Sequence, residues 1–350
     1  MPALAPVRQG GPAPAAKLPC MAAVLTPNDD PDMQRSPGVQ PGAELFIVMN
    51  RGSGKNGKDE VRAAIAAELD AAGRPHRFVP VAPGEIVQAC QEAARLAHEH
   101  GGVLVAAGGD GTINCAAQAA LAQDCPLGVI AQGTFNLFAR QNGLPLEAAE
   151  AARALLQAQP EPVQVGWVNQ RAFLVNASVG LYPKLLADRE AAKQKLGRRR
   201  WIAMLAALKS MLEWRAQLVL DAELDGQLTQ LRTASVFVCN NRLQLQRVGV
   251  QEEVVAQVGE GRLACLLMRA SGVWTKLRTL AAAAVGQLAA EPEIDSFTLR
   301  TLTVGARNAR RLKVATDGEV TWMQLPLRFT VAPRPLRLML PPADQRLPVK

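Results

Sequence analysis

The stretch VLVAAGGDGT, residues 103–112, decides the fold. Its first five residues form a continuous apolar run, which is typical of a strand buried on both faces of a parallel sheet. Two glycines follow, and they allow a sharp turn because neither carries a Cβ. Thr112 then suits the N-cap of a helix. Since backbone N–H groups at a helix start favour anions, the stretch predicts a phosphate site between a strand and a helix.

Strands and helices alternate on both sides of this stretch. Apolar runs predict strands at 45–49, 76–81, 103–107 and 127–131. Helical spacing of apolar residues predicts helices at 59–72, 85–100, 113–122 and 147–158. This alternation is typical of a doubly wound parallel sheet. We therefore expect an α/β nucleotide-binding domain over residues 43–161.

The pattern changes near residue 162. Short β-rich runs predict strands at 163–168, 172–177, 217–224, 232–239, 263–268, 297–304, 311–316 and 327–331. Helical spacing predicts three helices, near 184–195, 199–213 and 273–289. We expect a β-sandwich-like second domain over residues 162–335. A disordered leader is expected at 1–42, which is rich in Pro, Ala and Gly, and a tail at 336–350.

The composition narrows the class of protein. The chain has 350 residues, 39 Lys and Arg against 31 Asp and Glu, and a net charge of +8, which suits an anionic partner. Aromatic residues make up only 4%, so platforms for stacking nucleic-acid bases are scarce. We therefore expect a phosphorylated ligand or a membrane surface as partner, and no nucleic acid.

The same composition bears on the compartment. Six scattered cysteines without a CxxC pair predict reduced, mostly buried thiols and no dedicated His/Cys metal site. No apolar run is long enough to cross a membrane, and no secretory signal precedes the domains. We expect a soluble, cytoplasmic protein.

Three glycine-rich loops follow predicted strands of the first domain. The first, GSGKNGK at 52–58, fits GxGxxG and nearly fits the Walker pattern, but Asp59 stands where the Walker pattern needs a hydroxyl. A flexible turn that caps the next helix is the alternative for this loop. In the second loop, GGDGT at 108–112, Asp110 suits Mg²⁺ or orientation of a transferred group better than direct contact with phosphate. The third loop is GTFN at 133–136. Because the carboxyl ends of parallel strands meet in one crevice, we expect the three loops to share a nucleoside triphosphate.

These loops resemble the motifs of the diacylglycerol kinase catalytic-domain family, the bacterial soluble lipid kinases related to sphingosine and ceramide kinases. The resemblance rests on Asn50 with Gly52-Ser53-Gly54, on GGDGTIN at 108–114 and on GTFN at 133–136. NASVGLYP at 176–183 and DGE at 317–319 fit the same family. The resemblance implies a nucleotide-binding α/β domain, a β-sandwich domain, and ATP-dependent phosphorylation of a lipid hydroxyl between them.

The resemblance also implies roles for individual residues. With Mg²⁺ near Asp110, the implied contacts of ATP are Asn50, Gly52, Ser53, Gly54, Gly108, Gly109, Asp110, Gly111, Thr112, Asn114, Gly133, Thr134 and Asn136. The general base would be Asp317 or Glu319, which lie two apart and so on one face of a strand. A hairpin turn with surface acids is the alternative for these two residues. A structural Mg²⁺ would bind the backbone carbonyls of Gln257 and Arg262 and the carboxylate of Glu260.

Five positions depart from the family pattern. Leu137 and Gln164 stand where many relatives carry Asp, and Glu260 replaces the usual Asp of the structural metal site. Pro80 occupies a position where relatives can offer a Thr hydroxyl to ATP, and Cys115 replaces a Glu. These departures indicate a subgroup built around Gly-Thr-Phe-Asn.

The partners implied are a lipid substrate and, transiently, the inner face of the membrane. Arg198-Arg199-Arg200 precede an apolar stripe from Trp201 to Leu212, which suits docking on anionic lipid. Packing of this stripe against the β-rich domain is the alternative. A homodimer is a further option. Two other functions stay open, a phosphotransferase similar to NAD kinase or phosphofructokinase, and a non-catalytic protein that binds nucleotide or lipid.

Overall fold

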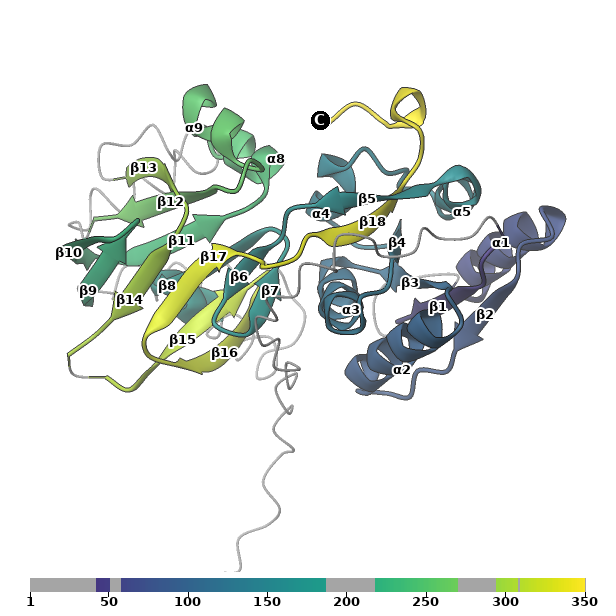
Figure 1. Ribbon diagram of the computed structural model, residues 1–350, viewed down its shortest axis with the longest axis horizontal. Helices are drawn as coiled ribbons and strands as arrows, with labels where there is room; N and C mark the ends of the chain where they lie inside the picture. The colour runs from purple at the N-terminus through teal and green to yellow at the C-terminus, as the bar shows by residue number, and fades with distance from the viewer. Residues whose placement is uncertain (1–41, 51–57, 187–217, 270–293, 308, 350) are drawn as a thin grey trace, which may run out of the picture.

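The computed structural model describes residues 42–50, 58–186, 218–269, 294–307 and 309–349, which form two domains side by side (Figure 1). The expected leader and most of the first glycine loop lie outside these residues. The expected helices at 199–213 and 273–289 also lie outside them, as does the helix expected at 184–195 from residue 187 on.

A six-stranded sheet forms the centre of the first domain, in the order β2-β1-β3-β4-β18-β5. Its strands are β1 (Leu45–Met49), β2 (His76–Val79), β3 (Val103–Gly108), β4 (Leu127–Ala131), β5 (Gln159–Val163) and β18 (Leu336–Leu340). The pairs from β2 to β18 run parallel, and β5 is antiparallel to β18 at the edge. The expected parallel sheet is confirmed, with one antiparallel edge strand.

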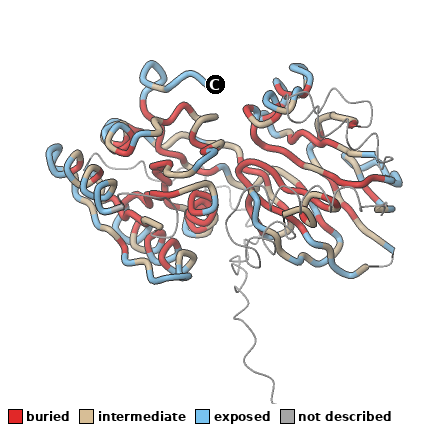
Figure 2. Tube along the Cα trace, turned by 180° about the vertical axis from the view of Figure 1, so that it is seen from behind, coloured by how far each residue is buried: buried red, intermediate tan, exposed pale blue. Residues whose placement is uncertain are grey.

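Helices cover both faces of this sheet. They are α1 (Lys58–Ala71), α2 (Ile86–Glu99), α3 (Asp110–Gln123), α4 (Leu137–Gln141) and α5 (Ala148–Gln157). Ile65 and Leu69 of α1 pack with α5 over Ile47 of β1 on one face. Small side chains of α2 and α3 pack over Val48 and Ala106 on the other. The central strands are therefore buried on both sides, as Figure 2 shows, and the sheet is doubly wound as expected.

The second domain is built from two antiparallel sheets, in the orders β10-β9-β14-β17-β6-β7 and β13-β12-β11-β8-β15-β16. The strands are β6 (Gly166–Val168), β7 (Arg171–Phe173), β8 (Asn176–Gly180), β9 (Leu218–Leu224), β10 (Gln227–Thr233), β11 (Ser235–Cys239), β12 (Leu263–Met268), β13 (Ile294–Leu299), β14 (Leu302–Gly305), β15 (Arg311–Thr316), β16 (Glu319–Gln324) and β17 (Leu327–Val331). Phe173 and Phe329 of the first sheet are buried in one core with Val236 and Val314 of the second. The β-sandwich-like domain is confirmed.

Short turns divide several of the expected strands. The run at 172–177 contains β7 and the start of β8, and the run at 297–304 contains parts of β13 and β14. The hairpin between β15 and β16 turns at Asp317-Gly318, where both residues have positive φ, 47° and 86°. The sequence patterns also missed α8 (Arg242–Arg247), α9 (Glu252–Gln257) and the 3-10 turn Ala343–Gln345, each of which is shorter than the window that a helical period needs.

The expected tail at 336–350 instead begins with strand β18, which lies between β4 and β5. Leu336, Leu338 and Leu340 are buried there, and this burial stabilises the pairing. Its parallel partner β4 lies far earlier in the chain, so no local pattern could place it. The chain consequently passes between the domains twice, and the two passages are joined where Ala332 N donates to Val165 O at 2.8 Å.

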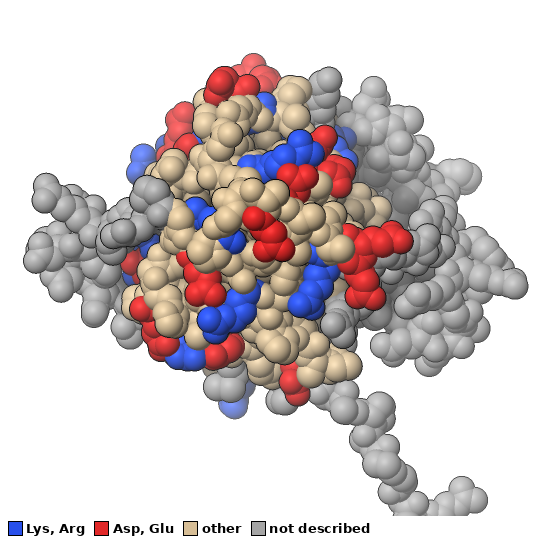
Figure 3. Space-filling model, turned by 90° about the vertical axis from the view of Figure 1, so that its right-hand side faces the viewer, with Lys and Arg blue, Asp and Glu red and all other residues tan. Residues whose placement is uncertain are grey.

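The charged side chains and the cysteines differ in where they lie. Figure 3 shows acidic and basic side chains interspersed on the end of the first domain, so the net positive charge forms no basic patch there. Cys90, Cys115, Cys125, Cys239 and Cys265 are free and buried, as expected. Within the residues described, the helices are too short or too polar to cross a membrane.

Candidate functional site

Two of the glycine loops touch each other at the carboxyl end of the first sheet. We call residues 108–112 loop 2 and residues 133–136 loop 3. A Cβ on Gly133 would stand 2.9 Å from the Cα of Gly109, so the two backbones are in direct contact. Gln132 N also donates to Gly108 O at 2.7 Å. Loops 2 and 3 therefore share one edge of the sheet, as the parallel topology requires.

Asn50, the residue after β1, is bonded to β3 and to loop 2. Its Nδ2 donates to Thr112 Oγ1 at 3.3 Å, and its backbone N–H donates to Ala107 O at 3.3 Å. The end of β1 is thereby joined to the first turn of α3. Gly52, Ser53 and Gly54 lie outside the described residues, so their contact with ATP stays a prediction.

Loop 2 presents the start of helix α3. Gly108 permits the close return of the chain, because a Cβ there would stand 2.7 Å from the Thr112 Cβ. Gly109 is the N-cap and has no side chain to bond the first-turn N–H groups. Thr112 N and Ile113 N donate to the Gly109 carbonyl at 2.9 and 3.1 Å, whereas the N–H groups of the first two helical residues have no acceptor within the helix. The start of α3 therefore offers donors to an anion, as in other phosphate sites at helix N-termini.

The Asp110 carboxylate has one bonded oxygen and one buried oxygen without a partner. Its Oδ2 accepts a hydrogen bond from Asn136 N at 3.1 Å. Its Oδ1 is buried and has no hydrogen-bond partner among the described residues. Burial raises the pKa of Asp110, and backbone N–H groups of loop 3 and the start of α4 oppose that shift. A buried carboxylate oxygen without a partner fits Mg²⁺ or its bound water, since Mg²⁺ prefers oxygen ligands.

Loop 3 is closed on itself by Asn136. This residue has a left-handed backbone, φ 50°, and its Oδ1 accepts from Gly133 N at 2.8 Å. Its Nδ2 donates to Gly133 O at 3.1 Å. Both ends of its amide are therefore used to shape the loop, whereas Thr134 and Phe135 are exposed. We expect Thr134, and not the Asn136 side chain, to meet a ligand.

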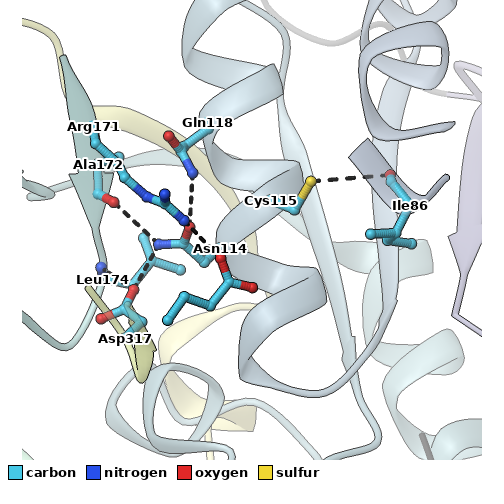
Figure 4. Close-up of polar contacts among 9 residues, drawn as sticks. Ile86, Asn114, Cys115, Gln118, Arg171, Ala172, Leu174 and Asp317 are labelled. Atoms are coloured by element: carbon cyan, nitrogen blue, oxygen red, sulfur yellow. Dashed lines mark hydrogen bonds and ion pairs between the residues drawn. The ribbon is translucent and has the colours of Figure 1, made fainter. Parts of the chain in front are cut away.

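Asn114 faces the second domain, although the resemblance implies a contact with ATP. Its Nδ2 donates to Asp317 Oδ2 at 2.6 Å and to Ala172 O at 3.2 Å, and its Oδ1 accepts from Gln118 Nε2 at 2.8 Å (Figure 4). The side chain is buried. It therefore joins α3 to the second domain.

Asp317 is the centre of this junction. Its Oδ1 accepts hydrogen bonds from the backbone N–H groups of Val175 at 2.9 Å and Asn176 at 3.0 Å. Its Oδ2 accepts from Leu174 N at 2.7 Å as well as from Asn114. Burial raises the pKa of Asp317, and these four hydrogen bonds to the carboxylate oppose that shift. Because both oxygens already accept two bonds, the carboxylate is poorly placed to receive a proton from a substrate.

Glu319 is the first residue of β16, two positions after Asp317. Its side chain is 60% exposed, and its Oε2 pairs with Arg171 Nη2 at 2.6 Å. Its Oε1 lies 3.6 Å from the point where a Cβ on Gly111 would stand, so this oxygen borders loop 2. The turn is thus a hairpin, but its acids are not simply surface groups, because Asp317 accepts from Asn114 of the first domain and Glu319 borders Gly111.

Arg171 is a residue of this site that the sequence patterns missed. It is 7% exposed, and within the part of the chain that the structure describes its Nε has no hydrogen-bond partner. It stands just before the β-rich run expected at 172–177 and belongs to no motif, so no sequence signal distinguished it. Its ion pair holds the Glu319 carboxylate at the edge of loop 2.

The residues expected to bind a structural Mg²⁺ do not fit that ion. The Arg262 carbonyl already accepts two hydrogen bonds, from Gln164 Nε2 at 3.0 Å and from Gly259 N at 3.5 Å, so neither of its lone pairs is left for a metal ion. Glu260 is exposed. Among the described residues, no group of three or more His, Cys, Asp or Glu side chains could hold a metal ion.

The other departures from the family pattern have plain structural roles. Leu137 packs against the core of the first domain, and its carbonyl accepts from Asn241 Nδ2 at 3.2 Å. Cys115 is buried, with its Sγ 4.0 Å from Ile86 O (Figure 4). Pro80 is exposed after β2.

Comparison with known proteins assigns both halves of the chain. Residues 44–168 match the diacylglycerol kinase catalytic domain, and residues 183–340 match the YegS C-terminal NAD kinase beta sandwich-like domain. "Probable lipid kinase YegS-like" of Pseudomonas aeruginosa is 39% identical over 145 residues, which cover 40% of this chain and 46% of that protein. "Diacylglycerol kinase" of Bacillus subtilis strain 168 is 31% identical over 189 residues, 53% of this chain and 60% of that protein. The chain spans about half the length of these curated relatives.

The fold has a counterpart among solved structures. The crystal structure of a diacylglycerol kinase from Bacillus anthracis strain Sterne superposes with a TM-score of 0.61 at 18% identity, and the match covers 88% of this chain and 99% of that one. At this identity, the likeness shows the fold.

Proposed function

Residues 44–168 belong to the diacylglycerol kinase catalytic-domain family, and from this premise we propose that the chain transfers the γ-phosphoryl group of ATP to a lipid hydroxyl. One observation carries the proposal. Glu319 of the second domain borders Gly111 at the start of α3, where loops 2 and 3 meet. A phosphate bound by the first domain and a hydroxyl bound by the second would thus meet beside a carboxylate.

The triphosphate would lie along the two loops. The N–H groups at the start of α3 would bind its oxygens, and the absence of side chains at Gly109 and Gly133 lets the backbone approach them. Asp110 would hold Mg²⁺ through Oδ1, while the bond from Asn136 N keeps its other oxygen in place. When bound, Mg²⁺ neutralises charge on the phosphates during transfer.

Glu319 is the better placed of the two expected bases. The lipid hydroxyl oxygen would bond to the γ-phosphorus while the bond from phosphorus to the bridging oxygen breaks and ADP leaves. The hydroxyl proton would pass to the Glu319 carboxylate, which is exposed and borders Gly111. Arg171 would position this carboxylate through the ion pair. Asp317, whose oxygens are filled by four hydrogen bonds, would hold the two domains in register.

The lipid would be taken from a membrane surface, with the chain in the cytoplasm and transiently at the inner face of the membrane. Trp322 of β16 is 56% exposed. The Arg311 guanidinium lies 4.8 Å and the Lys313 ammonium 5.5 Å from the centre of its ring. An exposed indole with two cations suits the interface of an anionic bilayer. The basic and apolar stripe at 198–212 lies outside the described residues, so its part in docking stays an expectation.

A transfer assay tests the function. The full chain is incubated with ATP labelled at the γ-phosphate, Mg²⁺, and mixed micelles containing diacylglycerol, phosphatidylglycerol, ceramide or a sphingoid base. Label in one of these lipids supports the proposal, and Glu319→Gln should lower that rate by about two orders of magnitude. Label transferred to NAD and to no lipid would favour an NAD-kinase-like activity. Nucleotide binding without any transfer would favour a non-catalytic protein.

A further inference from the structure

Gln164 occupies the first passage between the two domains, directly after β5 and two residues before β6 begins. Its backbone carbonyl accepts from Asn240 Nδ2 at 3.0 Å. Asn240 is buried at the end of β11, and it also donates to Leu174 O at 3.3 Å. Gln164 therefore belongs to a polar junction that joins the passage to the second domain.

Both N–H groups of the Gln164 side-chain amide donate hydrogen bonds. Its Nε2 donates to Asn240 Oδ1 at 2.8 Å and to Arg262 O at 3.0 Å. Its Oε1 accepts from Gly261 N at 2.8 Å. Because a carbonyl can only accept and a backbone N–H can only donate, these partners determine which end of the amide is nitrogen.

The same segment is bound from a second side by Arg242. Its Nη2 donates to Ala256 O at 3.1 Å, and its Nε donates to Val258 O. Residues 256–262, which we call the junction loop, therefore present three backbone carbonyls to donors from the chain itself. A guanidinium supplies a full positive charge at one end of this loop, and an amide supplies two N–H groups at the other.

We propose that the chain holds the junction loop without a metal ion, with the Gln164 amide and the Arg242 guanidinium in place of the cation that the family resemblance implies there. A carboxylate at position 164 would place an oxygen against the Arg262 and Asn240 oxygens, and a cation between them or a proton on the carboxylate would be needed to remove the repulsion. An amide nitrogen makes the same contacts as hydrogen bonds. This inference concerns the junction and stands apart from the proposed activity.

Thermal unfolding of the full chain, without nucleotide, in EDTA and in millimolar Mg²⁺ tests the inference. All samples carry Asp110→Asn, so that binding of metal at loop 2 does not enter the comparison. With Gln at position 164, the Tm should be the same in EDTA and Mg²⁺. Gln164→Glu, which is isosteric, should lower the Tm by several degrees in EDTA and regain most of it in Mg²⁺. Gln164→Ala, which adds no charge, should lower the Tm by the same amount in EDTA and in Mg²⁺.

Two results would overturn the inference. One is a higher Tm in Mg²⁺ than in EDTA for the protein with Gln at position 164, if this difference disappears when Glu260→Ala is added. The other is a Gln164→Glu protein that folds and gains no more from Mg²⁺ than Gln164→Ala does. If Gln164→Glu fails to fold, binding of Mn²⁺ to the Asp110→Asn protein is measured instead. A bound Mn²⁺ that is lost when Glu260→Ala is added would contradict the proposal, and the absence of such a site would support it.

Discussion

Replacing Asp317 by Asn tests whether its carboxylate has a structural or a catalytic role. Four donors converge on the Asp317 oxygens, three from the backbone at 174–176 and one from Asn114. An Asn side chain has the same shape but only one acceptor oxygen, and its NH₂ group would face two of these donors. The backbone donors cannot turn away, since they lie between β7 and β8.

The expected loss of stability follows from those contacts. Asp317→Asn removes two hydrogen bonds to a charged acceptor, each worth about 1.5–3 kcal/mol, so we expect the free energy of unfolding to fall by about 3–6 kcal/mol. Glu319→Gln, the comparison variant, keeps an acceptor oxygen for the buried Arg171 guanidinium but removes the charge, and we expect its free energy of unfolding to fall by less, about 1–3 kcal/mol. The order reverses for activity, because Glu319 and not Asp317 borders loop 2.

Urea unfolding and the lipid-phosphorylation assay, run on both variants, provide the comparison. Activity is measured at a temperature where each protein is folded, and the rate is expressed per folded molecule. An Asp317→Asn protein with the stability of the wild type and a rate lower by about two orders of magnitude would refute the reasoning and would make Asp317 the base.

Three further outcomes are expected. Gly133→Ala should weaken ATP binding, measured by calorimetry, because its Cβ would stand 2.7 Å from Asn136 Oδ1 and 2.9 Å from Gly109 Cα, and unchanged affinity would contradict the contact of loops 2 and 3. Arg311→Ala combined with Lys313→Ala, which removes the two cations beside Trp322, should reduce co-sedimentation with anionic vesicles and leave binding to neutral vesicles unchanged, whereas an equal loss on both would argue against an anionic surface. Burial raises the pKa of Cys125 to about 12 from 9.0. Between pH 9 and 12 the thiol is therefore protonated in the folded protein and ionised in the unfolded chain. The free energy of unfolding should fall across this range, and this thiol should contribute about 1.4 kcal/mol per pH unit to the fall. Urea titrations of Cys125→Ala should show a correspondingly shallower fall.

Local patterns predicted the first domain and the placement of its loops. Buried strands, glycine turns and helix starts are each specified by a few neighbouring residues, and the parallel topology then brings loops 2 and 3 to one edge. The convergence of Gly109 and Gly133 could therefore be predicted from the sequence. The position of β18 could not, because its partner β4 is distant in the chain and only burial of Leu336, Leu338 and Leu340 identifies it.

The roles of polar residues at the domain junction needed the structure. Asp317 and Glu319 are equivalent in the sequence, yet one accepts four hydrogen bonds and the other is exposed beside Gly111. Arg171 and Gln164 contact residues more than ninety positions away, at 319 and at 261–262. No spacing in the sequence reports such contacts, and for that reason the patterns missed Arg171 and left the partners of Gln164 open.

The most direct test of the central claim is a crystal structure of the full chain with a non-hydrolysable ATP analogue and Mg²⁺. The account predicts the triphosphate along loops 2 and 3, the metal at Asp110 Oδ1, and the γ-phosphate between the start of α3 and the Glu319 carboxylate. A nucleotide bound away from both loops would contradict this account. So would a triphosphate bound in the reverse direction, with its γ-phosphate pointing away from Glu319.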